Sequence, residues 1–370
     1  NGSVTSAKGF TANGICAGVK ASNTTKKDLA LIYCDKVCNS AAIFTKNLVK
    51  SDTIYVTKKH LENGTAQAVV VNSGNANACN PDGYEKAEKM CSLAADALGV
   101  DENDVIVAST GVIGQPLPIE PIASGIEKLK GTLSKDGGIS AAEAIMTTDT
   151  VKKQWAVETV LDGKKVTIGG IAKGSGMIHI NMGTTLSFVT TDAAISSEML
   201  KSALIEAADV SYNMVSVDGD TSTNDTLAIM ASGYAGNKEI TEKNDDYKIF
   251  TAVLTDAFKK VAKKLAKDGE GATKLLICKV DGAKDDKSAK IISKSIICSS
   301  LVKAAMFGAD ANCGRILCAI GYSGAETDVK KIDVSYKSAK GEILVCKDGN
   351  GLVFDEDKAC LLYTSDAADD

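Results

Sequence analysis

Histidine is scarce in this chain, which has only two among its 370 residues. Histidine is the side chain that most often accepts a proton at neutral pH, because its ordinary pKa is about 6.5. A hydroxyl nucleophile in this chain is therefore expected to use another base.

Cysteines are present, but they lack the spacing of a metal site. The closest pairs are Cys34 with Cys38 and Cys313 with Cys318, and neither has CxxC spacing or a second pair that would complete a zinc site. The odd count of eleven, scattered singly through apolar segments, favours reduced and buried thiols over a disulfide framework. We predict no bound metal.

Long apolar runs and an excess of positive charge are also missing. No run approaches the roughly 18 apolar residues that span a bilayer, and no leader-like segment opens the sequence, so a cytoplasmic protein without a membrane partner is expected. The net charge of −5 gives no basic stripe for nucleic acid. Acidic small substrates would have to be met by individual Lys or Arg side chains.

The pattern of apolar residues predicts a layered protein of helices and strands. Expected strands lie at residues 53–57, 68–72, 104–109, 165–172, 185–191, 275–280, 315–322 and 332–338. Expected helices lie at residues 84–99, 196–213, 245–269 and 288–308. Several strands are apolar at successive positions, which is typical of burial on both faces. With four prolines and no Ser/Gly-rich linker, composition marks no domain boundary.

A Gly-Thr pair, Gly183 and Thr184, stands directly before one of these strands. A threonine hydroxyl becomes a nucleophile beside a base, and the free α-amine of an N-terminal threonine, with a pKa of about 7.7 to 8.0, is such a base. Thr184 would gain that amine only if the bond before it were cut, and glycine there leaves room for its hydroxyl to attack the preceding carbonyl. The alternative is a turn that merely starts a strand.

Four further stretches combine glycine with small polar residues. Residues 108–114 (ASTGVIG) could aim backbone N–H groups and the Thr110 hydroxyl at an oxyanion, or simply end a strand. Residues 69–80 (VVVNSGNANACN) suit close approach of a ligand, with a packing role equally open. Residues 217–226 carry three carboxylates without EF-hand spacing, and residues 269–274 (GEGATK) lack Walker spacing, so neither predicts a metal or nucleotide site.

Six motifs, in this order, resemble one family. VVNSGNANAC, ASTGVIG, AIMTTDT, GIAKGSGMIHINMGTTLSF, VDGDTSTNDT and KDGEGATK are similar to the bifunctional ornithine acetyltransferase, or glutamate N-acetyltransferase, family of arginine biosynthesis, and the resemblance runs from about Gly9 to Ala359. It implies an α+β fold, a layered αββα sandwich of the ornithine acetyltransferase and self-processing aminopeptidase type. It also implies self-cleavage before a threonine and transfer of an acetyl group from N2-acetyl-L-ornithine to L-glutamate.

The resemblance implies a role for several residues. Thr184 is the expected nucleophile, and the bond between Gly183 and Thr184 is the expected cleavage site, although many relatives have Ala in place of Gly183. The implied oxyanion hole consists of Thr110 and Gly111. The implied substrate contacts are Thr147, Lys173, Thr184 and Glu270, with Lys173 meeting a substrate carboxylate and Glu270 a cationic side-chain end.

The resemblance also predicts the processed form. Residues 1–183 would form an α chain and residues 184–359 a β chain, assembling as a heterotetramer of two α and two β chains with acetylornithine, ornithine, glutamate and acetylglutamate as small-molecule ligands. No bound cofactor is expected, and many members also accept acetyl-CoA as donor. Residues 360–370 (CLLYTSDAADD) resemble the translation of a sequencing adapter and are predicted to be a non-native tail that replaces a segment with an Asn and a Thr of the substrate site.

Two rival functions remain at this stage. An N-terminal-nucleophile hydrolase or aminopeptidase of the related fold would use water as the acceptor. A non-enzymatic binding protein would use its glycine loops only to hold a small ligand, and its chain would stay intact.

Overall fold

A computed structural model describes residues 2–179 and 185–363, which form two compact units. The first unit comprises residues 1–215 and 220–270, and the second comprises residues 216–219 and 271–370. The division after Glu270 is one that composition did not reveal. Among the described helices, none is long and apolar enough to cross a membrane.

One eight-stranded mixed sheet organises the first unit, in the order β4-β3-β2-β10-β8-β6-β5 with β1 also paired to β2. Its strands are β1 (Phe10–Ile15), β2 (Leu29–Phe44), β3 (Thr65–Asn75), β4 (Val105–Val112), β5 (Lys153–Leu161), β6 (Lys164–Lys173), β8 (Leu186–Thr191) and β10 (Thr226–Ala231). The long strand β2 pairs through residues 29–34 with β1 and through residues 39–44 with β10. Its pairing register with β3 shifts between Tyr33 and Cys38, so β2 belongs to both halves of the sheet.

The two halves of this sheet share one apolar core. Phe10, Ile32 and Val69 from β1, β2 and β3 belong to the same buried cluster as Phe188 and Met230 from β8 and β10. The short helix α4 (Gly138–Ala144) contributes alanines to this cluster. Because side chains alternate across a strand, the neighbouring residues point to the two outer faces.

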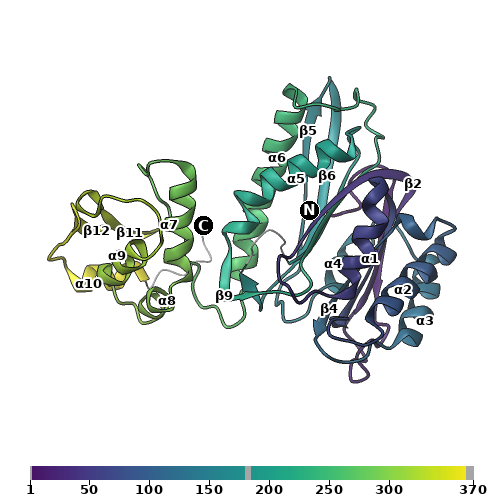
Figure 1. Cartoon of the computed structure of the whole chain (residues 1–370), viewed down its shortest axis with the longest axis horizontal. Helices are drawn as coiled ribbons and strands as arrows, with labels where there is room; N and C mark the ends of the chain where they lie inside the picture. The colour runs from purple at the N-terminus through teal and green to yellow at the C-terminus, as the bar shows by residue number, and fades with distance from the viewer. Residues whose placement is uncertain (1, 180–184, 364–370) are drawn as a thin grey trace. The chain divides into compact units, whose positions relative to one another are not determined.

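Helices cover both outer faces, as Figure 1 shows for α2 and α3 on one side and α5 and α6 on the other. They are α1 (Asp52–His60), α2 (Gly83–Leu98), α3 (Ile119–Lys130), α5 (Ser197–Asp209) and α6 (Asp245–Lys267). Leu31 of β2 and Val70 of β3 share a second buried cluster with Met90 of α2. Phe258 of α6 packs its ring against Trp155 of β5, with ring centroids 6.0 Å apart. The predicted α+β fold with αββα layers is confirmed.

The second unit has its own core. It contains α7 (Asp286–Cys298), α8 (Ser300–Phe307), α9 (Cys313–Gly321), β11 (Val334–Ser338), β12 (Gly341–Lys347), β13 (Asn350–Gly351) and α10 (Glu356–Tyr363). The three strands pair in the order β11-β12-β13. Ile296, Val302, Val345 and Leu362 are buried together in this unit. The prediction of a non-native tail at residues 360–370 stays a prediction, and residues 364–370 lie outside the described residues.

Two short strands and four 3₁₀ helices complete the described elements. The strands β7 (Ile178–His179) and β9 (Ser216–Thr221) form a two-stranded sheet. Short 3₁₀ helices lie at Leu61–Asn63, Glu102–Asp104, Tyr212–Met214 and Val329–Lys331.

Four predicted elements are wrong. Residues 53–57 lie in α1 and residues 315–322 almost entirely in α9, where the Asn312 side chain caps the helix by accepting from Arg315 N–H. Residues 275–280 form no strand. The helix expected over 288–308 is broken at Ser299, whose extended backbone and side-chain cap start α8.

Candidate active site

The end of β4 carries the predicted oxyanion residues, Thr110 and Gly111. Here β4 runs parallel to β3, and the pairing register shifts between Gly74 and Asn75. Gly111 has a φ of 136°, and a Cβ at this position would lie 2.3 Å from the Gly74 carbonyl carbon. Only glycine fits this close backbone approach.

An asparagine ties three of the motifs together at this strand end. Asn224, in residues 217–226, donates through Nδ2 to the Ala76 carbonyl at 2.6 Å and to the Ser109 carbonyl at 2.7 Å. Ala76 belongs to residues 69–80 and Ser109 to residues 108–114. The Asn224 side chain therefore supplies a buried hydrogen-bond donor to both carbonyls and joins the three stretches at this point.

Lys173, at the end of β6, makes the central contact of the site. Its Nζ donates to Thr110 Oγ1 and to Thr147 Oγ1, both at 3.0 Å. A lysine ammonium has only donors, so both threonine oxygens act as acceptors here. The hydroxyl protons of Thr110 and Thr147 are consequently directed to other acceptors. Lys173 thus leaves both hydroxyls, that of Thr110 on β4 and that of Thr147 in the turn after α4, as donors to other groups.

Burial and two aspartates act in opposite directions on the pKa of Lys173. Lys173 is buried, and burial lowers its pKa against the opposing effect of Asp149 and Asp225, which favour the ammonium form. Asp225 is buried as well. Burial raises its pKa well above the usual range for aspartate, while Lys173 and Ser222 act in the opposite direction.

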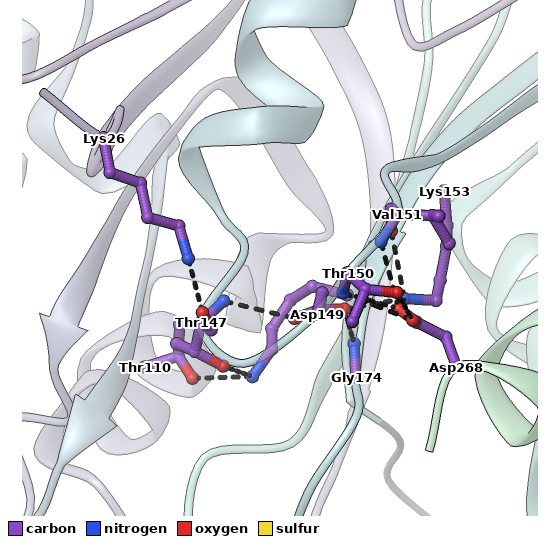
Figure 2. A network of polar contacts seen from close by, with 10 residues as sticks. Lys26, Thr110, Thr147, Asp149, Thr150, Val151, Lys153, Gly174 and Asp268 are labelled. Atoms are coloured by element: carbon purple, nitrogen blue, oxygen red, sulfur yellow. Dashed lines mark hydrogen bonds and ion pairs between the residues drawn. The ribbon is translucent and has the colours of Figure 1, made fainter. Parts of the chain in front are cut away.

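A second buried lysine lies behind Thr147. Figure 2 shows Asp149 extending from the Thr147 turn towards Lys153 and Asp268. Lys153 Nζ lies 2.7 Å from Asp149 Oδ1 and 2.5 Å from Asp268 Oδ2. The Lys26 ammonium also donates to the Thr147 carbonyl. The Thr147 turn is therefore held from both sides.

Glu270, the last predicted substrate contact among the described residues, lies on an exposed turn. Its backbone N–H donates to the Ser175 carbonyl at 3.1 Å, two residues beyond Lys173. A Cβ on Gly176 would lie 2.2 Å from Glu270 Oε2, so the carboxylate covers this glycine. Glu270 thereby lies next to the turn that follows Lys173.

The predicted cleavage site, Gly183 and Thr184, lies outside the described residues. Thr185, the next described residue, is buried, and a Cβ added on Gly174 would lie 2.6 Å from Thr185 Cγ2. The following residue, Leu186, pairs with Lys173 across β6 and β8. The chain thus returns to the Lys173 turn immediately after residue 184.

Comparison with known proteins decides the family. The profile of the ArgJ family matches residues 11–367. The "Arginine biosynthesis bifunctional protein ArgJ 1" of Clostridium acetobutylicum is 49% identical over 367 residues, covering 99% of this chain and 90% of the relative. This chain belongs to the ArgJ family. The resemblance predicted from the motifs is confirmed.

Other ArgJ proteins show comparable similarity. The "Arginine biosynthesis bifunctional protein ArgJ" of Caldanaerobacter subterraneus subsp. tengcongensis is 50% identical over 360 residues, or 97% of this chain and 89% of that protein. The crystal structure of ArgJ from Bacillus halodurans shares 45% identity with a TM-score of 0.46, over 49% of this chain and 94% of that chain. The crystal structure of ornithine acetyltransferase from Mycobacterium tuberculosis in complex with ornithine shares 34% identity with this chain, with a TM-score of 0.44. The match covers 49% of this chain and 96% of that chain.

In this ArgJ chain the structure brings together Thr110, Thr147 and Lys173, which the motifs had named without placing them in contact. Four buried charged or amide residues that support the site were not predicted from the sequence: Asp149, Lys153, Asn224 and Asp268. Asp149, Asn224 and Asp268 lie inside the family motifs, and this position is the sequence signal by which they could have been found. Lys153 lies outside every motif.

Among the described residues of this ArgJ chain, no group of three or more His, Cys, Asp or Glu side chains is placed to hold a metal ion. The predictions of no metal and no bound cofactor stay predictions.

Proposed function

We propose that this ArgJ chain cuts itself between Gly183 and Thr184, and that Thr184 then carries an acetyl group from N2-acetyl-L-ornithine to L-glutamate. Membership of the family makes the chain an acetyltransferase of arginine biosynthesis. The observation that carries the proposal is the Lys173 contact with Thr110 and Thr147, made where β8 begins just after residue 184.

Self-cleavage supplies the base that histidine does not. The Thr184 hydroxyl attacks the Gly183 carbonyl carbon, the peptide nitrogen leaves as the Thr184 amine, and water opens the resulting ester to a free carboxylate. The new amine then accepts the hydroxyl proton during catalysis. A base with a pKa of about 7.7 to 8.0 has a useful neutral fraction at the pH of the cell.

Acetyl transfer follows in two balanced steps. Thr184 Oγ attacks the acetyl carbonyl, and the amine passes the hydroxyl proton to the leaving nitrogen of ornithine, which leaves an acetyl ester on Thr184. The glutamate amine then attacks the ester and Thr184 Oγ regains a proton. Both steps pass through an oxyanion, and we assign its stabilisation to the Thr110 hydroxyl and the Gly111 N–H.

The orientation of the Thr110 hydroxyl supports this assignment. Because Lys173 Nζ donates to Thr110 Oγ1, the hydroxyl proton is left for the oxyanion. The ammonium of Lys173 also places a positive charge one hydrogen bond away from the developing negative charge. The same ester would form from acetyl-CoA, which we propose as a second donor.

The two ends of the substrate are assigned to different turns. Lys173 uses two of its three protons on the threonines, and we assign the third to the carboxylate that ornithine and glutamate share. Thr147 would add a hydroxyl donor at this end. Glu270, exposed on the neighbouring turn, would meet the cationic side-chain end of ornithine. The reaction is proposed to run in the cytoplasm, in a heterotetramer of two α and two β chains.

Mass spectrometry of the purified protein tests the cleavage step. We expect one fragment that ends at Gly183 and another that begins at Thr184, and Thr184→Ala should leave only intact chain. Intact wild-type protein, or both fragments in Thr184→Ala, would contradict the proposal. The conservative Thr184→Ser variant should still cleave, because serine keeps the hydroxyl.

The choice of acceptor separates transfer from hydrolysis. With 14C-acetylornithine as donor, the acetyltransferase should form labelled acetylglutamate when glutamate is present. A related hydrolase would release labelled acetate at the same rate with or without glutamate. Release of ornithine without transfer of the label to glutamate would therefore favour the hydrolase.

A further inference from the structure

Three buried charges form a cluster in the first unit that the mechanism above does not use. Lys153, at the start of β5, lies between Asp149 and Asp268, with Nζ to carboxylate distances of 2.7 and 2.5 Å. The side chains of Lys153 and Asp149 are fully buried, and that of Asp268 is 5% exposed. We call these three residues the buried charge cluster.

The first carboxylate holds the turn of Thr147 and Lys173. Asp149 Oδ2 accepts from the Thr147 N–H at 3.1 Å, and its Oδ1 accepts from the Gly174 N–H at 2.7 Å. Gly174 follows Lys173 directly in the chain. Asp149 thus fixes the backbone at both residues assigned to the carboxylate end of the substrate.

The second carboxylate holds the chain that leads to Glu270. Asp268 caps α6 and accepts from the N–H groups of Thr150 and Val151 at 3.2 to 3.4 Å and from the Thr150 hydroxyl. Glu270 follows two residues later. Lys153 is the cation that joins the two carboxylates, so it links the Thr147 and Lys173 turn to the Glu270 turn.

Net stability does not explain this arrangement. A buried ion pair gains little over an apolar replacement, because desolvation of the charges offsets their attraction. Elsewhere in the chain, ion pairs such as Lys248 with Asp245 are exposed, with side chains 70% and 91% accessible. What the buried charge cluster does offer is a fixed distance between two backbone turns that lie far apart in the sequence.

We propose that Lys153 is a positioning residue that sets the separation between Glu270 and the Lys173 turn, and thereby the length of the diamino acid that the enzyme prefers. The inference rests on the proposed function, in which those two turns meet opposite ends of the substrate. Without Lys153, no cation joins the two carboxylates, so the two turns are free to separate and a longer substrate loses less than a shorter one. The two facing carboxylates also repel each other, which lowers the stability of the variant.

Lys153→Met is the test, because methionine keeps most of the volume and removes the charge. We expect its KM for acetylornithine to rise about tenfold or more, while kcat falls by less than about threefold, because the nucleophile and oxyanion hole stay in place. The ratio of kcat/KM for N2-acetylornithine to kcat/KM for N2-acetyllysine, which is one methylene longer, should fall. Self-cleavage at Thr184 should proceed as in the wild type.

Three controls separate positioning from lost stability. Lys248→Met removes the cation of an exposed pair on α6 and should change neither KM nor selectivity. Phe250→Leu weakens the packing of the buried face of α6 without touching the cluster. It is the control for the lowered thermal stability expected of Lys153→Met. Asp268→Asn combined with Lys153→Met removes the repulsion, so it should recover stability while KM stays raised.

The outcomes distinguish the inference from the function on which it rests. A wild-type protein that neither cleaves nor transfers acetyl groups refutes the proposed function. An active wild type with normal selectivity in Lys153→Met overturns the positioning role alone. So does a KM that recovers along with stability in the double variant, or that rises equally in Phe250→Leu.

Discussion

Replacing Thr110 by valine removes one hydroxyl from the candidate active site and preserves the shape of the side chain. Thr110 is 7% exposed, and its Oγ1 accepts from Lys173 Nζ at 3.0 Å. Two losses follow. Lys173 loses one of its two threonine partners, and the proposed oxyanion hole loses its side-chain donor.

The two losses have different sizes and different readouts. A hydrogen bond to a charged group contributes about 1.5 to 3 kcal/mol, so the free energy of unfolding should fall by about that amount. Removing one oxyanion donor typically lowers kcat by about 10² to 10³. Because the backbone N–H of Gly111 remains, some activity should persist. Thr110→Ser keeps both functions and should stay within about tenfold of the wild type.

Thr147→Val is the matched control for this prediction. It removes the other partner of Lys173, also at 3.0 Å, and should cost similar stability. Since Thr147 is assigned to the substrate and not to the oxyanion, its loss should raise KM more than it lowers kcat. Urea unfolding and steady-state acetyl transfer measure the two effects. Equal kcat values in the two valine variants would refute the role given to Thr110.

Two further predictions concern the surroundings of the site. Gly111→Ala places a Cβ 2.3 Å from the Gly74 carbonyl carbon, at a φ of 136°. We expect this variant to lower the free energy of unfolding by about 1 to 3 kcal/mol and to suppress acetyl transfer. An unfolding curve in urea equal to that of the wild type would contradict this expectation. Asp149 and Asp268 have pKa values below the ordinary 3.8: burial acts to raise them, but the lysines and the donated N–H and O–H groups outweigh it. Their contribution to stability should be present above about pH 4 and lost as the pH falls through the native pKa values, so acid unfolding of wild type should be steeper than that of Asp268→Asn.

The parts of the fold that the sequence predicted are those with long, regular patterns. The helices α2, α5 and α6 carry apolar residues at helical spacing over 13 to 23 residues, and β3, β4 and β8 are apolar at successive positions. The short stretch at 53–57 is rich in β-branched residues, yet it folds as helix α1, with Ile54 and Val56 buried. Tertiary packing decides such short segments against intrinsic preference.

The long strand β2 was missed because its centre does not look like a strand. Asp35 and Lys36 lie in the middle of the 16 residues, in the stretch where the pairing register with β3 shifts. Charged residues at a bulge interrupt the apolar pattern while the strand continues. The role of β2 in joining the two halves of the sheet depends on these long-range pairings, which no local pattern contains.

The residues of the candidate site likewise comprise some that the sequence predicted and others that it did not. The family resemblance was enough to name Thr110, Thr147 and Lys173, because each lies in one of the six motifs that carry it. Lys153 follows Lys152 in the chain, and neighbouring strand residues face opposite sides. Lys152 has an exposed partner in Glu143, whereas Lys153 is fully buried between two carboxylates. Composition cannot tell which of two adjacent lysines faces the core.

His60, one of the two histidines of the chain, lies away from the candidate site. His60 is buried, with Nδ1 2.8 Å from the Val105 carbonyl at the start of β4, whereas Thr110 lies five residues along that strand, roughly 16 Å away at about 3.3 Å per residue. At that distance the His60 ring does not contact Thr110 at the candidate site. The proposed oxyanion hole instead has Lys173, whose Nζ lies 3.0 Å from Thr110 Oγ1. The proposed mechanism still needs a neutral base, and we propose the amine released at Thr184 for that role.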